Sequence, residues 1–322
     1  MPKVFIAIPT YNSKEYLKEC IISIQQNVSI DYKIAIADDG STDGTKEMIE
    51  REFPEILLIF HEHNEGINQS RRDLVQAFFN MQEYDFFMRL DADTEVFKNS
   101  IETLVEFLEK SEKVGAVGPQ IVNAQGITDY TSYGLDRIGA WKTFKDYSFI
   151  VWKCVDFLKN KLMKPTLLDH PIQVDHTLGA AVLAKRQAVI DAGLPDTHIA
   201  YYREDTDWPY EMKEKDWEIW YNPQALVKHI GGSTTVQTQM YQQGKDAYLK
   251  SGWNFIHKWY PGKWNEIKFT SAVIGGSLLS LMFGILLIPF AVVSSKVRIV
   301  TKRIFRTFTN VIVWHVRISG KQ

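Results

Sequence analysis

Two aspartates one residue apart are the feature of this sequence that most directly suggests chemistry. Asp91 and Asp93 end a short apolar run that begins at Phe86 and is typical of a strand buried on both faces. In open α/β sheets, ligands bind beyond the carboxyl ends of the strands. Carboxylates in that position suit Mg²⁺ or Mn²⁺, which such sites hold together with substrate phosphates. An exposed acidic turn without a ligand is the alternative interpretation, because Asp-x-Asp also occurs by chance.

The elements expected around these aspartates alternate between strand and helix. Apolar runs predict strands, and apolar residues at helical spacing, such as Leu17, Cys20, Ile21 and Ile24, predict helices. This alternation indicates right-handed βαβ units in a mostly parallel sheet. The expected strands are 3–8, 33–37, 56–60, 86–93 and 114–118, and the expected helices include 17–24, 46–52, 68–81 and 101–108.

Three polar segments follow expected strands, so they should meet at one edge of a parallel sheet. They are 9–11 (Pro-Thr-Tyr), 38–41 (Asp-Asp-Gly-Ser) and 91–93 (Asp-Ala-Asp). The sequence contains neither G-x-G-x-x-G nor G-x-x-x-x-G-K-[ST], the two patterns of a glycine-rich phosphate loop. Phosphates are therefore expected to be bound through a metal ion rather than by such a loop.

Composition and charge indicate a folded protein and argue against a nucleic-acid binder. The 322 residues are 45% hydrophobic and 24% charged, which suits one or two packed domains. Eight Lys/Arg and no acidic residue lie from Ile267 onward, which leaves 29 basic against 39 acidic residues in the preceding part. An acidic body with a basic tail fits binding of cations and of anionic lipid. The two cysteines, Cys20 and Cys154, indicate neither a disulfide framework nor a zinc site.

A membrane segment is expected near the C-terminus. Residues 272–293 carry no charge and are long enough to span the hydrocarbon core, with a buried globular helix as the alternative. The basic, amphipathic pattern after them is typical of a helix at an anionic surface. The segment either spans once or re-enters at Pro289, and both remain open, because a single span would place the basic tail outside. The N-terminus enters a strand without a secretion signal, so the body is expected on the cytoplasmic side.

Several motifs together resemble those of the family-2 glycosyltransferases of GT-A fold. They are 8–12, 38–45, 64–66 with Arg71, and 89–93, in the family's order and spacing. The resemblance implies an α/β GT-A fold, a Rossmann-like and mostly parallel sheet flanked by helices, with a C-terminal transmembrane or re-entrant helix and a basic amphipathic helix. The expected parts are a catalytic domain 1–235 (nucleotide-binding half 1–120, acceptor half 121–235), a helical linker 236–270 at the membrane interface, a membrane helix 271–294 and a basic tail 295–322.

Two later segments extend the resemblance. Residues 201–208 resemble the Glu-Asp motif that carries the family's catalytic base. This similarity implies Asp205 as the general base, with Glu204 as the less favoured choice. Residues 227–234 resemble an element of rhamnosyl- and galactofuranosyl-type members, whose histidine completes the metal shell, and this implies His229 as a metal ligand. An acid-rich helix start and a structural histidine are the ordinary alternatives for these two segments.

The resemblance also implies roles for the remaining motif residues. Asp93 is the expected main ligand of Mn²⁺ or Mg²⁺, and Asp91 binds either the metal or the ribose. Asp39 is expected to accept a hydrogen bond from the nucleotide base, and Arg71 to approach the diphosphate, although a solvated helix charge is the alternative for Arg71. The expected nucleotide-sugar-binding set is Pro9, Thr10, Tyr11, Asp38, Asp39, Asn64, Gly66, Arg71, Arg89 and Asp91.

These expectations describe an inverting, metal-dependent glycosyltransferase associated with a membrane. Its partners would be a UDP- or dTDP-sugar donor, a lipid-linked or cell-surface glycan acceptor and membrane lipid, with no nucleic acid. A polyprenyl-phosphate sugar synthase, which transfers to a phosphate, is the nearest enzymatic alternative. A membrane-tethered scaffold that binds nucleotide-sugars without catalysis and a nucleotidyltransferase are the alternatives from other classes.

Overall fold

The structure is a computed structural model of the whole chain, and its chain falls into two compact units. The first comprises Met1–Leu135 with Leu168–Tyr241, and the second comprises Asp136–Leu167 with Gln242–Gln322. The residues that the structure describes are 1–128, 133–134, 143–144, 148, 168–199, 203–231 and 240–291. The segments 201–202 and 232–234 of the later motifs and the basic tail 295–322 lie outside the described residues.

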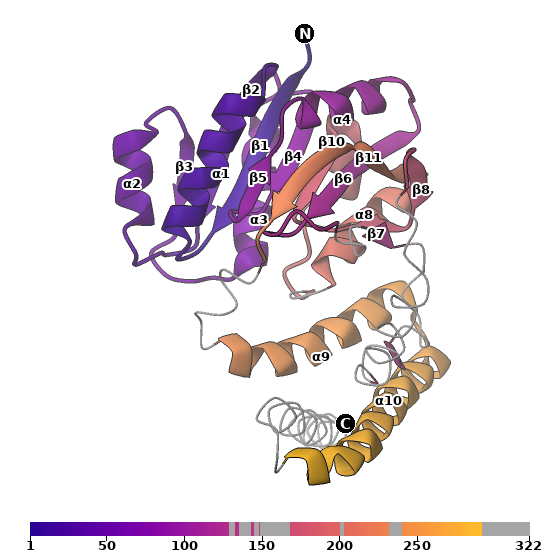
Figure 1. The fold of residues 1–322 in the computed structure, drawn as a ribbon. Helices are drawn as coiled ribbons and strands as arrows, with labels where there is room; N and C mark the ends of the chain where they lie inside the picture. Colours follow the sequence, from indigo (N-terminus) through magenta and orange to yellow (C-terminus); the bar gives the residue numbers. More distant parts are fainter. Residues whose placement is uncertain are drawn as a thin grey trace. The chain divides into compact units, whose positions relative to one another are not determined.

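A nine-stranded sheet forms the centre of the first unit (Figure 1). Its strands lie in the order β3-β2-β1-β4-β10-β6-β11-β5, and β8 pairs with β11. A second, two-stranded sheet joins β7 (Tyr133–Gly134) to β9 (His176–Thr177). The strands of the large sheet are β1 (Lys3–Thr10), β2 (Asp31–Asp38), β3 (Leu57–Phe60), β4 (Phe86–Leu90), β5 (Thr94–Val96), β6 (Val114–Val122), β8 (Ile172–Val174), β10 (Ala181–Lys185) and β11 (Glu218–His229).

Six of the nine strands of the large sheet run in one direction, but only four of its eight strand pairings are parallel, fewer than in the mostly parallel sheet that the sequence predicts. β1, β2, β3 and β4 pair in parallel, and so do β6 and β11. β10 lies antiparallel between β4 and β6, and the short strands β5 and β8 pair antiparallel with β11. The α/β fold class of the prediction is therefore confirmed, in the form of a mixed sheet.

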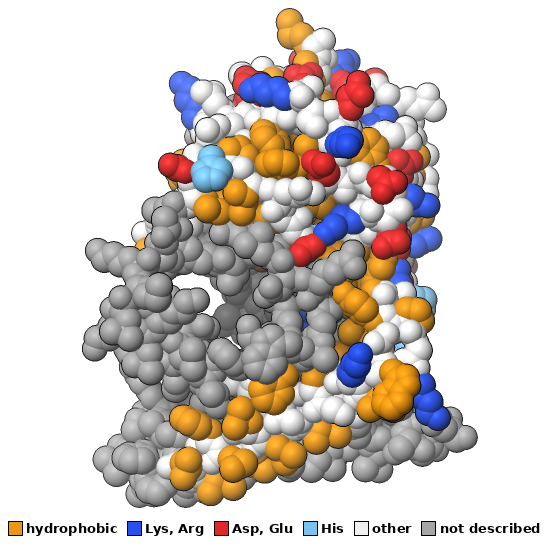
Figure 2. All heavy atoms as spheres, turned by 90° about the vertical axis from the view of Figure 1, so that its right-hand side faces the viewer, with side chains coloured by type: hydrophobic (Ala, Val, Ile, Leu, Met, Phe, Trp, Pro, Cys, Tyr) orange, Lys and Arg blue, Asp and Glu red, His pale blue; other side chains and the backbone are white. Residues whose placement is uncertain are grey.

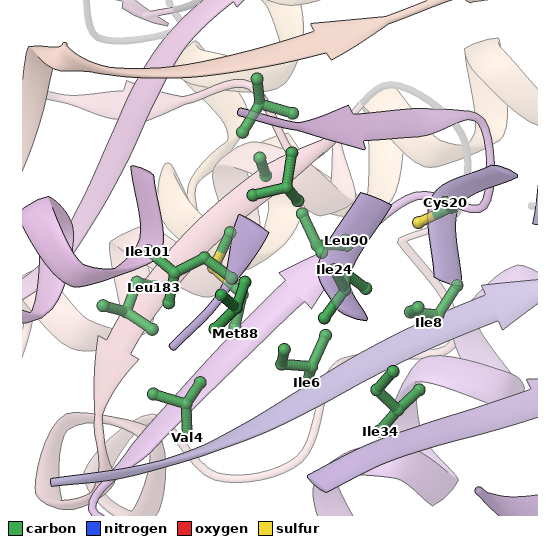
Figure 3. Packing of buried hydrophobic residues seen from close by; sticks show 14 of the residues in the cluster. Val4, Ile6, Ile8, Cys20, Ile24, Ile34, Met88, Leu90, Ile101 and Leu183 are labelled. Atoms are coloured by element: carbon green, nitrogen blue, oxygen red, sulfur yellow. The ribbon is translucent and has the colours of Figure 1, made fainter. Parts of the chain in front are cut away.

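Helices cover both faces of this sheet because successive apolar side chains of its strands point to opposite faces. In β1, Val4, Ile6 and Ile8 belong to one core cluster (Figure 3). Phe5 and Ala7 belong to the other. The first cluster includes side chains of α1, α2 and α4, and the second includes side chains of α3, α7 and α8. These helices are α1 (Lys14–Asn27), α2 (Thr45–Glu52), α3 (Ile67–Asn80), α4 (Ser100–Glu109), α7 (Arg186–Ala192) and α8 (Glu204–Lys213).

The chain leaves β4 earlier than the sequence predicts. The strand ends at Leu90 instead of Asp93, and a turn follows in which the Thr94 hydroxyl donates to the Asp91 carbonyl at 2.8 Å. Thr94 then begins β5, which pairs with the end of β11 so that Thr94 lies opposite His229. Apolar periodicity did not reveal this three-residue strand, because so short an element has no pattern of its own.

The second unit contains two long helices, α9 (Met240–Trp259) and α10 (Lys263–Ala291). They contact each other through the rings of Trp253 and Phe269, 5.9 Å apart, and through a 3.5 Å pair between His257 and Glu266. The segment Lys263–Phe283 of α10 is the one described helix that is long and apolar enough to cross a membrane. Figure 2 shows hydrophobic side chains along the lower edge of the view, where α10 lies in Figure 1.

Candidate active site

The three predicted metal ligands lie together at one edge of the large sheet. Asp91, Asp93 and His229 each offer a ligand atom within 4.8 Å of the other two. Nε2 of His229 is 3.2 Å from Oδ1 of Asp93 and 4.0 Å from Oδ2 of Asp91. Two carboxylates and an imidazole form a donor set that Mn²⁺ accepts well and Mg²⁺ accepts through its oxygens. The residues present therefore fit a divalent cation.

Backbone pairing holds this cluster in place. The Asp91–Asp93 turn joins β4 to β5, and β5 pairs with β11, the strand that ends at His229. The amide of Ile230 also donates to the Asp93 carbonyl at 3.0 Å. Two segments far apart in the sequence are thus fixed to each other by main-chain hydrogen bonds, which do not depend on a bound ion.

Arg71 lies between the metal cluster and the Glu-Asp motif. Its guanidinium nitrogens are 3.7 Å from Asp91, 3.1 Å from Glu204 and 3.9 Å from Asp205. The side chain is nearly buried, so the alternative of a solvated helix charge is wrong for this residue. Its position on α3, which begins after Gly66, brings the guanidinium to the same sheet edge as the two motifs.

Asp205 is held by the other buried arginine and by a main-chain amide. Nη2 of Arg89 pairs with Oδ1 of Asp205, and the amide of Gly179 donates to Oδ2 at 3.1 Å. A Cβ atom on Gly179 would overlap both Oδ1 of Asp205 and Nη2 of Arg89. Only glycine therefore allows the backbone, the carboxylate and the guanidinium to approach this closely.

The pKa values of the two acids of the motif are shifted in opposite directions. Burial alone would raise the pKa of Asp205, but the charges of Arg89 and Arg71 outweigh it and hold this pKa below its usual value. Burial and the neighbouring charge of Asp205 raise the pKa of Glu204. At neutral pH the pair is therefore best described as an ionised Asp205 beside a Glu204 that ionises less readily.

Asp39 lies on the nucleotide side of the predicted site, just after β2. It is almost completely buried, and its Oδ1 and Oδ2 accept hydrogen bonds from the amides of Glu65 (2.8 Å) and Gly66 (2.9 Å). Gly66 has a φ of 98°, a conformation that favours glycine, and α3 begins directly after it. Asp39 thus ties the end of β2 to the start of the helix that carries Arg71.

The structure separates the remaining predicted residues into supporting and exposed positions. Asp38 is fully buried, and its Oδ1 accepts from the Ser41 amide at 2.9 Å, so its carboxylate shapes the loop. Thr10 is also buried, and its hydroxyl has no partner among the described residues. Tyr11 is half-buried, and Asn64 is exposed, so neither takes part in the network around the two arginines.

Pro9 lines a cavity together with the two arginines and is not one of the metal-cluster residues. Pro9, Arg71, Arg89 and Glu204 line one small cavity of ≈ 20 Å³, together with apolar side chains such as that of Trp208. That volume holds about one water molecule. The cavity is far too small for a nucleotide-sugar, so any donor would have to bind at the sheet edge outside it.

Two residues that support these acids were missed by the sequence analysis. His61, just beyond β3, places Nδ1 3.0 Å from Oδ1 of Asp39 and Nε2 2.9 Å from Oδ2 of Asp73. Gly179, whose amide donates to Asp205, is the other. A single histidine after a strand and a single glycine before one give no signal in the sequence, because their partners lie far away along the chain.

Comparisons with known proteins bear on the family and the fold of this chain. Residues 5–161 match the model of glycosyl transferase family 2. The poly-beta-1,6-N-acetyl-D-glucosamine synthase of Staphylococcus epidermidis is 25% identical over 261 residues, which cover 76% of this chain and 55% of that protein. The matches support glycosyltransferase family 2. The family match ends at residue 161, so the Glu-Asp motif and His229 lie beyond it.

Two further comparisons concern other glycosyltransferases. The abequosyltransferase of Salmonella typhimurium is 31% identical over 115 residues, 34% of each chain. The crystal structure of GalNAc-T7 with UDP, GalNAc and Mn²⁺ has the same fold, with a TM-score of 0.58 at 16% identity over 85% of this chain and 51% of that one. The chain spans about half or less of the length of each of these three relatives. The similarity to solved glycosyltransferases shows the fold alone.

Proposed function

We propose that this family-2 protein is an inverting, divalent-cation-dependent glycosyltransferase. It would move a sugar from a UDP- or dTDP-linked donor to a hydroxyl of a lipid-linked or cell-surface glycan. The observation that carries the proposal is the meeting of a donor set that fits a metal ion with a half-buried carboxylate, Asp205, through the shared guanidinium of Arg71. The names of the relatives, a glucosaminyl-polymer synthase and a sugar transferase, support an acceptor of this class.

Each group then has a part in the transfer. The acceptor oxygen attacks C1 of the donor sugar, its proton passes to a carboxylate oxygen of Asp205, and the C1–oxygen bond to the diphosphate breaks. The leaving nucleoside diphosphate keeps that bond's electron pair. A cation held by Asp91, Asp93 and His229 would supply positive charge against the charge on the leaving group. Arg71, already beside Asp91, is placed to bind the same phosphates once they displace its carboxylate partners.

The proposed role of Asp205 agrees with its surroundings. Its lowered pKa keeps it ionised at neutral pH, so it can accept a proton. Glu204 pairs with Arg71 at 3.1 Å, so we assign this carboxylate to holding the guanidinium rather than to acting as the base. The subtype, near rhamnosyl- and galactofuranosyl-transferases, and the cytoplasmic, membrane-associated location remain part of this proposal.

A donor screen tests the proposal. The full chain, in detergent with Mn²⁺ and an acceptor extract, is incubated with a panel of UDP- and dTDP-sugars, and nucleoside diphosphate release is measured. We expect release from at least one donor, with Asp93→Asn and Asp205→Asn slower by roughly 10²-fold or more. Asp169→Asn is the matched control, because that carboxylate is exposed and pairs with the neighbouring His170.

The same screen separates the alternatives. A polyprenyl-phosphate sugar synthase needs no strong base, so Asp205→Asn would stay largely active on a lipid phosphate. A nucleotidyltransferase would release pyrophosphate instead of nucleoside diphosphate. A scaffold would bind a donor without releasing anything, and that result would contradict the proposed catalysis.

A further inference from the structure

His61 lies between two carboxylates that belong to different elements. One is Asp39, just after β2, and the other is Asp73, in α3; the two ring nitrogens of His61 are 3.0 and 2.9 Å from them. The side chains of His61 and Asp39 are 9% and 4% exposed, so water cannot readily replace the hydrogen bond between them. Asp73 is itself oriented by the Gln69 side-chain amide, which donates to its other oxygen at 3.0 Å.

This geometry requires a charged imidazole. An ionised carboxylate only accepts hydrogen bonds, and a neutral imidazole carries one N–H, so bonds to two carboxylates need both nitrogens protonated. Burial acts to lower the pKa of His61, but the hydrogen bonds to Asp39 and Asp73 outweigh it, and the pKa lies above its usual value. Among the described residues, these two carboxylates are the charged groups that contact the ring.

The bonds to Asp39 also determine what this residue can still accept. A carboxylate has about four acceptor positions. Oδ1 of Asp39 accepts from the Glu65 amide and from His61, whereas Oδ2 accepts from the Gly66 amide. One position on Oδ2 therefore remains, which suits a ligand that presents a single N–H. The imide N–H of uracil or thymine is such a group.

We propose that His61 is a positioning residue which, held by Asp73, keeps the carboxylate of Asp39 oriented toward the imide N–H of a uridine or thymidine donor. This inference rests on the proposed function, because Asp39 can bind the nucleotide base only if a nucleotide-sugar binds at this edge of the large sheet. His61 itself does not touch the donor. Its effect belongs to donor affinity and not to the chemical step, since Asp205 and the metal ligands lie elsewhere in the site.

The charge on the His61 ring determines the direction in which nucleotide affinity changes with pH. As the pH rises through the raised pKa of His61, the ring loses one N–H and its charge, and Asp39 loses the cation that stabilises its bound orientation. Nucleotide affinity should therefore be highest below this pKa and fall above it. Removing Asp73 lowers the pKa of His61, because one of the two carboxylates that favour the charged form is lost, so the fall should begin at lower pH.

The role of His61 can be tested by calorimetry. The full chain is titrated with UDP and Mn²⁺ at a series of pH values from mildly acidic to mildly alkaline. We expect His61→Leu to weaken UDP binding about tenfold at the acidic end, the effect of one lost charge-assisted hydrogen bond. His61→Asn keeps an amide donor for Asp39 and should bind with intermediate affinity and no inflection. Asp73→Asn should bind like wild type at the acidic end and show its inflection at lower pH.

The control is His63→Gln, which changes an exposed histidine of the same loop. It should keep the wild-type profile. Wild-type affinity and inflection in both His61→Leu and Asp73→Asn would overturn the role of His61 while leaving the proposed function standing. If His61→Leu does not fold, the Asp73→Asn profile alone decides. Failure of the wild type to bind either UDP or dTDP would overturn the proposed function and this inference with it.

Discussion

Arg71 and Arg89 determine how the acids of the candidate site behave. Asp91, Glu204 and Asp205 lie around these two buried guanidinium groups, so negative charges outnumber positive ones before any cation is added. Burial is the first cause of the raised pKa values of Asp91 and Glu204, and the neighbouring charge of Asp205 raises both further, against the lowering effect of the two arginines. A divalent cation would relieve the excess charge, which is a physical reason for metal dependence that does not rest on resemblance.

Gly179 gives the sharpest prediction for a single residue. In Gly179→Ala, the new Cβ would overlap the paired oxygens and nitrogens of Asp205 and Arg89, so the carboxylate must move. We expect kcat to fall by roughly 10²-fold, the loss of a well-placed base, while the KM for the donor changes little. Steady-state kinetics of donor turnover measures both constants.

The matched control for this prediction is Gly118→Ala. Its Cβ would lie 2.7 Å from the side chain of Thr177, which is a milder overlap than at Gly179 and does not involve Asp205. Both variants should lose about 1–3 kcal/mol of stability through overpacking. Equal kcat values in the two variants would show that Gly179 matters for packing and not for the position of the base.

At the scale of elements, the α/β pattern could be predicted wherever it was local. Each expected strand from β1 to β6, and each expected helix between them, lies within a few residues of its observed place, because apolar periodicity follows the burial of one face. The reversed strand β10 and the pairing of β5 with β11 were not predicted. Pairing partners and strand direction depend on contacts between segments far apart in the sequence, which the periodicity of a single segment does not encode.

Contacts between distant segments also explain which site residues could be predicted from the sequence and which could not. Asp91, Asp93 and Asp205 belong to short motifs and could be named from the sequence. Gly179 and His61 act through partners at the ends of other elements. The role of His61 depends on the loops after β2 and β3 and on α3, and that of Gly179 on the turn before β10 and the start of α8.

Ser100 provides a test of how β11 is anchored. Its hydroxyl donates to the Leu226 carbonyl at 2.7 Å and accepts from the Leu226 amide at 3.1 Å, which fixes β11 to the start of α4 next to an irregular stretch of pairing with β6. Ser100→Ala leaves both main-chain groups without this partner, so we expect a loss of about 1–3 kcal/mol in the free energy of unfolding. Urea denaturation measures it, and an unchanged midpoint would contradict the anchoring role.

At the scale of the whole molecule, α10 has an unusual distribution of side chains. Its buried side is made largely of small and hydroxyl residues, and its exposed side carries large apolar ones, the arrangement found where lipid surrounds packed helices. The buried positions include Ala272, Val273, Ser277 and Ser280. The exposed positions include Trp264, Ile267, Ile274, Leu278, Met282, Ile285 and Leu286.

This arrangement predicts that α10 attaches the chain to membranes. Replacing Leu278 and Met282 together by Glu should move the full chain from the membrane pellet to the supernatant, because burial of charge in hydrocarbon costs several kcal/mol. Sedimentation of cell extracts measures this. Ile190→Glu is the control, since Ile190 is an exposed apolar residue of α7 in the first unit and should leave the distribution unchanged.

The central claim is that one sheet edge binds a nucleoside diphosphate through a metal ion held by Asp91, Asp93 and His229. Calorimetric titration of the full chain with UDP or dTDP, with Mn²⁺ and with a chelator, tests it most directly. We predict that Mn²⁺ strengthens binding at least tenfold in the wild type and has little effect in Asp93→Asn. Equal affinity with and without Mn²⁺, or the same metal effect in Asp93→Asn, would contradict it.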